Sequence, residues 1–176
     1  MPDADKVKNT TQKQESNEYS GKTDNEIKSI LQKQSSAKSK LETVSKLVRD
    51  ELDRCSKTKT KIAKSNETWL YCKKSNQTEI IIYTRTNNAE RFREIYFIEY
   101  GKLTYAFEEI LSDFINPNNN VTWNCQYGIE NDTIYDYVSL GHGETENDEW
   151  NPESILDQWK SQRNMYKELT TMANIR

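Results

Sequence analysis

Apolar residues recur at helical spacing from residue 24 to about residue 55. They fall three, four and seven positions apart, with a weak centre around residues 34–39. This pattern predicts an amphipathic helix of roughly 30 residues, bent or broken at Ser35-Ser36 and N-capped by Asp24. Clean heptads are too few for a coiled coil, so packing against a sheet is favoured. The apolar positions are Ile27, Ile30, Leu31, Leu41, Val44, Leu47, Val48 and Leu52.

Between residues 68 and 140 the pattern changes to short runs of β-branched and aromatic residues separated by Asn, Gly and Asp. Such runs are typical of strands. Turn-forming pairs such as Gly101-Lys102 and Asn131-Asp132 join several of them, and short links connect antiparallel neighbours. The candidate strands lie near 68–74, 78–85, 91–100, 103–111, 121–128 and 133–140.

A second helix is predicted to follow Asn151-Pro152-Glu153, where Asn suits the cap and Pro suits the first helical position. Its apolar face comprises Ile155, Leu156, Trp159, Tyr166, Leu169 and Met172. The elements together predict the α+β class. We expect an antiparallel, mostly meander sheet of five or six strands, with the long N-terminal helix and the C-terminal helix packed on one face. Residues 24–176 would form this single domain.

Residues 1–23 are almost wholly polar and contain a single aromatic residue, Tyr19. Such a segment cannot bury enough apolar surface to offset the entropy of ordering, so a disordered polar tail or tether is predicted. It resembles the polar tether of bacterial lipoproteins, although the chain contains no lipobox cysteine. This resemblance implies a periplasmic or cell-surface protein with a lipid anchor in the native precursor and a signal peptide removed. The alternative is a cytoplasmic protein, because the N-terminus shows no apolar signal region.

Charge is distributed unevenly along the chain. Residues 1–66 contain 15 Lys+Arg and 10 Asp+Glu, and the whole chain contains 25 and 28, so residues 67–176 contain 10 and 18. The two parts therefore carry about +5 and −8. Because the part predicted to fold is acidic, the distribution argues against nucleic-acid binding. No apolar run is long enough for a transmembrane segment.

One loop of the chain contains candidate catalytic or binding residues. The chain has no glycine-rich phosphate loop, nucleophile elbow or paired-histidine zinc motif, so we expect no enzyme, no cofactor and no metal. Any histidine-dependent mechanism must use His142, the single histidine. A dense run of carboxylates follows it, and a solvated acidic loop before a helix explains the run as well as a binding site does. The candidate binding residues are His142, Glu144, Glu146, Asp148 and Glu149.

Three cysteines, Cys55, Cys72 and Cys125, are too widely spaced for a zinc knuckle. Cys72 and Cys125 lie on predicted strands and can pair in an oxidising compartment if those strands are neighbours. Two buried free thiols are the favoured alternative.

From Leu103 to Trp159 the chain contains 12 acidic residues and no Lys or Arg. This composition suits electrostatic recognition of a basic protein surface, although solubility alone also explains it. The sequence therefore favours a non-catalytic binding or interaction module tethered through its N-terminus. The alternative is a cytoplasmic, immunity-type acidic inhibitor of a basic protein, and an enzyme using His142 with nearby carboxylates is less favoured.

Overall fold

The computed structural model describes residues 19–55, 60–73, 77–87, 90–112, 121–142 and 144–174. The chain divides between Ala37 and Lys38 into two compact units. Most of the tail predicted for residues 1–23 lies outside the described residues, so the tail stays a prediction. No helix within the described ranges combines the length and apolar character needed to cross a membrane.

The N-terminal unit contains the start of helix α2 (Asp24–Cys55). A capping box closes this helix end: the Thr23 N–H donates to the Glu26 carboxylate at 2.7 Å, and the Glu26 N–H donates to the Thr23 hydroxyl at 3.4 Å. The N-cap is therefore Thr23, and the prediction of Asp24 was wrong. The predicted break at Ser35-Ser36 was also wrong, because α2 continues through both serines.

The C-terminal unit contains one seven-stranded sheet in which every neighbouring pair is antiparallel and the spatial order follows the chain. The meander sheet of the α+β class is confirmed. Helix α3 (Ser154–Asn174) follows a short 3-10 helix, η1 (Glu144–Glu146). The strands are β1 (Thr60–Lys64), β2 (Glu67–Lys73), β3 (Thr78–Asn87), β4 (Glu90–Glu99), β5 (Lys102–Ser112), β6 (Val121–Glu130) and β7 (Thr133–Gly141).

The seventh strand is β1, which the sequence did not predict. Its residues, TKIAK, include two lysines and one large apolar side chain, so the segment lacks the alternation that marks a half-buried strand. Such a composition is common at sheet edges, where lysines discourage pairing with other chains. The turn predicted at 131–132 does form, and Asn131 and Asp132 both have positive φ, as a type I′ hairpin turn requires. The turn predicted at Gly101-Lys102 lies one residue earlier, at Tyr100-Gly101, and Lys102 begins β5.

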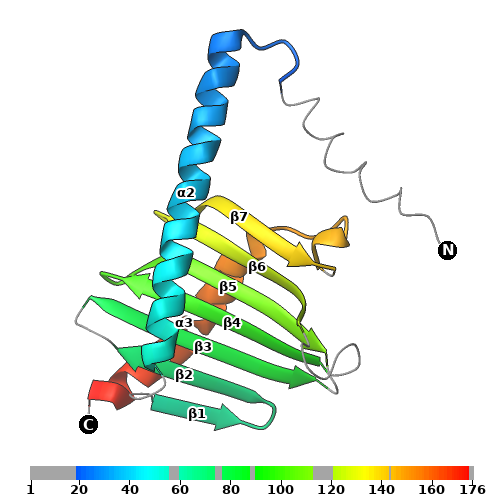
Figure 1. The fold of residues 1–176 in the computed structure, drawn as a ribbon. Helices are drawn as coiled ribbons and strands as arrows, with labels where there is room; N and C mark the ends of the chain where they lie inside the picture. The colour runs from blue at the N-terminus through cyan, green and yellow to red at the C-terminus, as the bar shows by residue number, and fades with distance from the viewer. Residues whose placement is uncertain are drawn as a thin grey trace, which may run out of the picture. The chain divides into compact units, whose positions relative to one another are not determined.

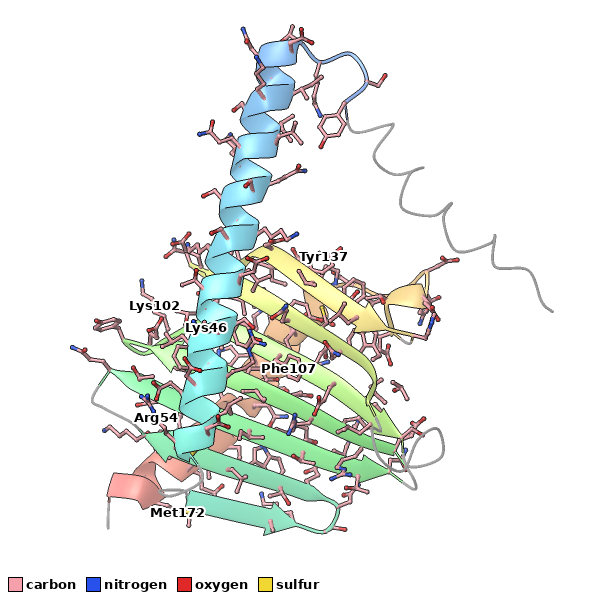
Figure 2. All side chains as sticks on the ribbon, in the orientation of Figure 1. Lys46, Arg54, Lys102, Phe107, Tyr137 and Met172 are labelled. Carbon is pink, nitrogen blue, oxygen red and sulfur yellow. A yellow bond between two sulfur atoms is a disulfide. The ribbon has the colours of Figure 1, made fainter. Side chains whose placement is uncertain are left out.

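The two helices cover opposite faces of the sheet, so their predicted placement on one face was wrong. Figure 1 shows α2 in front of the strands and α3 behind them. Adjacent residues of β3 point to opposite faces of the sheet. Ile80 belongs to the apolar cluster under α2, and Ile81 belongs to the cluster under α3. Phe107 packs in the α2 cluster (Figure 2). The run Ile95–Ile98 of β4 is therefore covered on both faces, as its consecutive buried residues require.

A disulfide joins Cys55, at the end of α2, to Cys72 on β2, with 5.6 Å between their Cα atoms. The predicted alternatives, a Cys72–Cys125 bond or two free thiols, were therefore both wrong for Cys72. Cys125 is a buried free thiol in the α3 cluster, and Cys72 lies in the α2 cluster. The sheet thus separates the two residues.

Reduction of the Cys55–Cys72 bond should lower the free energy of unfolding by about 3 kcal/mol, because the bond closes a loop of sequence separation 17. Urea denaturation with and without a phosphine reductant measures the change. The Cys125→Ala variant should show the same reductant effect, since Cys125 has no part in the bond. An unchanged midpoint on reduction would contradict the prediction.

Replacement of Trp159 by Ala should cost about 3 kcal/mol of stability. Its ring contacts Tyr96 of the sheet and Tyr166 of α3, at centroid distances of 5.0 and 5.6 Å. Met172→Ala, on the same helix but 38% exposed, should cost under about 0.5 kcal/mol. Equal losses for the two variants in chemical denaturation would mean that Trp159 does not anchor the helix.

Candidate functional site

A pocket of about 180 Å³ lies between the sheet and the first turns of α3. Strands β3 to β6 contribute to it, and the segment after β7 closes one side. Its lining combines carboxylates, aromatic rings and two side chains of α3. The lining residues are Arg85, Phe92, Arg93, Glu94, Glu108, Glu109, Ile110, Trp123, Glu144, Trp150, Ser154 and Gln158.

Two carboxyl groups, those of Glu94 and Glu108, project side by side on the α3 face of the sheet. The residues are direct partners in the β4–β5 register. Each lies two positions from a residue of the α3 cluster, Tyr96 or Ala106, and alternation places it on the same face. Opposed residues of an antiparallel pair have Cβ atoms about 5 Å apart, so these side chains are close neighbours.

Each of these carboxylates accepts a hydrogen bond from a buried tyrosine. The Tyr96 hydroxyl donates to Glu94 at 2.5 Å, and the Tyr127 hydroxyl donates to Glu108. The two rings are fully buried, so they fix the oxygen atoms that they contact. Burial, together with the neighbouring carboxylates, raises the pKa of both phenols, so each hydroxyl remains a proton donor.

Burial is the largest influence on the pKa values of the two carboxyl groups. The pKa of Glu108 is raised to about 7, chiefly by removal from water and also by the charges of Glu94 and Glu144, against the lowering effect of the Tyr127 hydrogen bond. Burial also raises the pKa of Glu94, which the Tyr96 hydrogen bond and Arg85 partly counteract. The pair therefore holds a proton more readily than exposed carboxyls do.

Aromatic side chains fix the loop that closes the pocket. The Trp123 indole N–H donates to the Thr145 hydroxyl at 3.1 Å, which ties η1 to β6. The Trp150 ring packs edge-on against Trp123 and Tyr137, at centroid distances of 6.5 and 5.5 Å. Glu144, beside Thr145, thereby becomes part of the pocket wall.

The other charged residues of the lining have partners of their own. Arg93 pairs with Glu109 at 2.5 Å, and both alternate with residues of the α3 face, so their side chains belong to the α2 face. Arg85 packs over the Phe92 ring, with its guanidinium carbon 4.9 Å from the centroid. The lining therefore contains four carboxylates and two arginines, and the Arg93–Glu109 ion pair leaves Glu94, Glu108 and Glu144 with Arg85.

The N-terminus of α3 is closed by its own residues. The Asn151 side chain accepts the Glu153 N–H, and the Asn151 carbonyl accepts the Ser154 N–H, both at 3.0 Å. Asn151 therefore caps the turn that precedes α3, whereas Pro152 lies in that turn and not at the predicted first helical position, because α3 begins at Ser154. These amide groups are occupied and do not point to an anion in the pocket.

The predicted binding residues lie on the segment between β7 and α3, and the structure brings one of them to the pocket. Glu144 lines it, whereas Glu146, Asp148 and Glu149 are exposed outside it. The His142 ring is 93% exposed, and its Nδ1 lies 2.6 Å from Glu146. His142 does not line the pocket, so the structure does not join it to the buried carboxylates.

Sequence reasoning missed the central pair, Glu94 and Glu108. The available signal was a glutamate inside each of two apolar strands, REIYF and AFEEI. Their pairing depends on the β4–β5 register, which contains an irregularity between Phe97 and Ile98. No local pattern specifies such an irregularity.

Comparison of the chain with protein-family models, with curated proteins and with solved structures finds no match. Among the residues that the structure describes, no group of three or more His, Cys, Asp and Glu side chains is arranged to hold a metal ion.

The raised pKa of Glu108 should make stability depend on pH. Between about pH 5 and pH 7 the folded chain retains a proton that the unfolded chain releases, so the free energy of unfolding falls as pH rises. The difference between wild type and Glu108→Gln should fall by up to about 1.4 kcal/mol per pH unit in this window. Urea denaturation at several pH values measures it.

Glu90→Gln is the matched control, because Glu90 lies on β4 but is exposed. Its stability profile should run parallel to that of wild type. A parallel profile for Glu108→Gln as well would show that Glu108 has an ordinary pKa.

Proposed function

We propose that the protein is a non-catalytic binding module whose pocket receives a positively charged group, an ammonium or a guanidinium. One observation carries this proposal: Glu94 and Glu108 lie side by side in a pocket, each fixed by a buried tyrosine. A ligand that enters meets two carboxyl oxygens held in place. Preorganised acceptors of this kind favour a cationic donor.

Electrostatics supports a cation over a neutral ligand. Ionised carboxylates are costly in a site removed from water, and an opposite charge within about 4–6 Å offsets the cost. The lining supplies two cations, Arg85 and Arg93, against four carboxylates, and Arg93 is already paired with Glu109. Trp123, Trp150 and Phe92 also line the pocket, and aromatic faces attract cations.

The size of the pocket indicates the size of this group. The pocket's volume of about 180 Å³ is well above the roughly 10–15 Å³ that a single water requires. A four-carbon amine, or the end of a lysine or arginine side chain, fits such a volume.

The group can thus belong to a free small molecule or to a basic protein. The exposed carboxylates Glu146, Asp148 and Glu149 favour a protein, because they would steer a basic surface toward the pocket. A module that binds a basic protein in this way would act as an immunity-type inhibitor of that protein.

We also propose that the protein is located in an oxidising compartment. The Cys55–Cys72 disulfide supports an oxidising environment, since such bonds persist in the periplasm and at cell surfaces and are rare in the cytosol. A periplasmic or cell-surface module tethered by its N-terminus is therefore preferred to a cytoplasmic one.

A second candidate function is acid–base catalysis in the same pocket. It is favoured by the pKa of Glu108, near 7 and beside a second carboxyl, because paired carboxyls with distinct environments serve as acid and base in several hydrolases. This candidate predicts turnover of a substrate, whereas the preferred function predicts binding alone.

Binding of n-butylammonium and n-butylguanidinium tests the preferred function. We expect both cations to shift the indole N–H resonances of Trp123 and Trp150 in ¹H–¹⁵N spectra, and the isosteric neutral n-butanol to leave them unchanged. The double variant Glu94→Gln/Glu108→Gln keeps the side-chain shapes and removes the charges. It should weaken cation binding by about tenfold or more, given the value of a charge-assisted contact.

Two controls locate the effect. Glu90→Gln should bind both cations as wild type does. The triple variant Glu146→Gln/Asp148→Asn/Glu149→Gln should also bind them normally, yet it should slow association of a lysine-rich peptide at low salt. Equal affinity for n-butanol and n-butylammonium, or unchanged cation binding by the Glu94/Glu108 variant, would refute the proposal.

A further inference from the structure

β7 is an edge strand of the sheet that the described residues form. β7 is the last strand in the spatial order, and within the described ranges no strand pairs with its outer side. The opposite edge differs, because β1 has five residues, two of them lysines, whereas β7 has nine residues with neither lysine nor proline. Short length, lysine and proline are the usual means of blocking an edge. β7 has none of them.

Backbone groups on this edge point away from the sheet at alternate residues. The His142 N–H donates to the Thr122 carbonyl at 2.9 Å, so this residue pair is hydrogen-bonded. Alternation along the continuous β6–β7 register then directs the amide and carbonyl groups of Tyr137 and Ser139 outward. The hydrogen bond of the Tyr137 N–H is consistent with this outward direction, since the N–H donates to the Asp136 carboxylate at 3.0 Å and not to β6.

Apolar side chains project on both sides of the same edge. Tyr137 is 43% exposed and lies on the α3 side, in contact with Tyr127 and Trp150. Leu140 is 61% exposed and alternates with it, on the side where Val138 packs. Figure 2 shows Tyr137 on the last strand. A strand added here would cover apolar surface on both faces.

Charge indicates which strand this edge would accept. Asp132 and Asp136 lie on or beside β7, and Glu144 and Glu146 follow it, without any Lys or Arg from Leu103 to Trp159. The carboxylate of Glu130 is already paired, with Lys40 at 2.9 Å. Antiparallel pairing of two β7 strands from two copies would bring these carboxylates together, which is unfavourable. A strand with lysine or arginine at alternate positions would instead complement them.

We propose that the β7 edge binds an extended, lysine- or arginine-rich segment of a partner protein by β-strand addition. The partner's carbonyl groups would accept the outward N–H of Ser139 and that of Tyr137, and a basic side chain of the partner would take over the Asp136 carboxylate. This surface is separate from the carboxylate pocket. The proposal therefore stands even if the pocket binds no cation.

A nine-residue synthetic peptide in which lysine and valine alternate serves as the probe, matching the length of β7. We expect it to increase the hydrogen-exchange protection of the Ser139 and Tyr137 amides. Ser139→Pro removes one outward N–H and leaves the β6–β7 ladder intact, because proline is tolerated where the N–H faces outward. This variant should bind the peptide about tenfold more weakly or worse, since it loses a backbone hydrogen bond and the fit of the strand.

Ser139→Ala is the matched control and should bind the peptide as wild type does. Asp136→Asn should weaken binding, with the larger loss at low salt. Glu94→Gln/Glu108→Gln should leave the peptide's protection of the Ser139 and Tyr137 amides unchanged, and this readout at the edge separates the test from that of the pocket. Equal binding by Ser139→Pro and Ser139→Ala would overturn the proposal. So would protection of the Ser139 amide in the protein alone at increasing concentration, which would assign the edge to a second copy.

Discussion

Burial of both faces of one antiparallel sheet is the constraint on which this structure depends. The central strands carry consecutive apolar residues, as in Ile95–Ile98, and successive side chains of a strand point to opposite faces. One helix cannot cover both faces, so α2 and α3 must lie on opposite sides. The candidate site follows from the same constraint. Near the N-terminus of α3 the covering is incomplete, and the space between helix and sheet contains carboxyl groups in place of apolar side chains.

Much of the fold could be predicted from local pattern. Six strands, the two helices and the Asn151 cap were found, because each depends on residues close in sequence. The positions of the helices were not, since the apolar pattern of a helix does not show which face of the sheet it covers. The pair Ile80-Ile81 and the run Ile95–Ile98 held the correct signal, because consecutive buried residues mark a strand covered on both sides. β1 was missed because its stability comes from its pairing with β2, which its own composition does not reveal.

The candidate site was less accessible to prediction than the fold. The sequence pointed to the loop after His142 as the binding site, because the carboxylates of that loop are close together in sequence. In the structure most of these carboxylates are exposed. Glu94 and Glu108 are separated by a turn and become neighbours only through strand register. The tyrosines that hold them, Tyr96 and Tyr127, come from two different strands. A site assembled across strands requires the register, which short-range sequence patterns specify weakly.

The disulfide also determines how the fold would carry mechanical load. Tension applied through the N-terminal end of α2 reaches Cys55 and there divides between the peptide chain leading to β1 and the bond to Cys72. The bond is the shorter covalent path, and β1 lies within the loop that it closes. The weakest strand of the sheet is thereby bypassed, and force passes directly to β2, whose seven residues all pair with β3. A pull from the N-terminus would therefore meet a full ladder of hydrogen bonds instead of peeling away the edge strand one residue at a time.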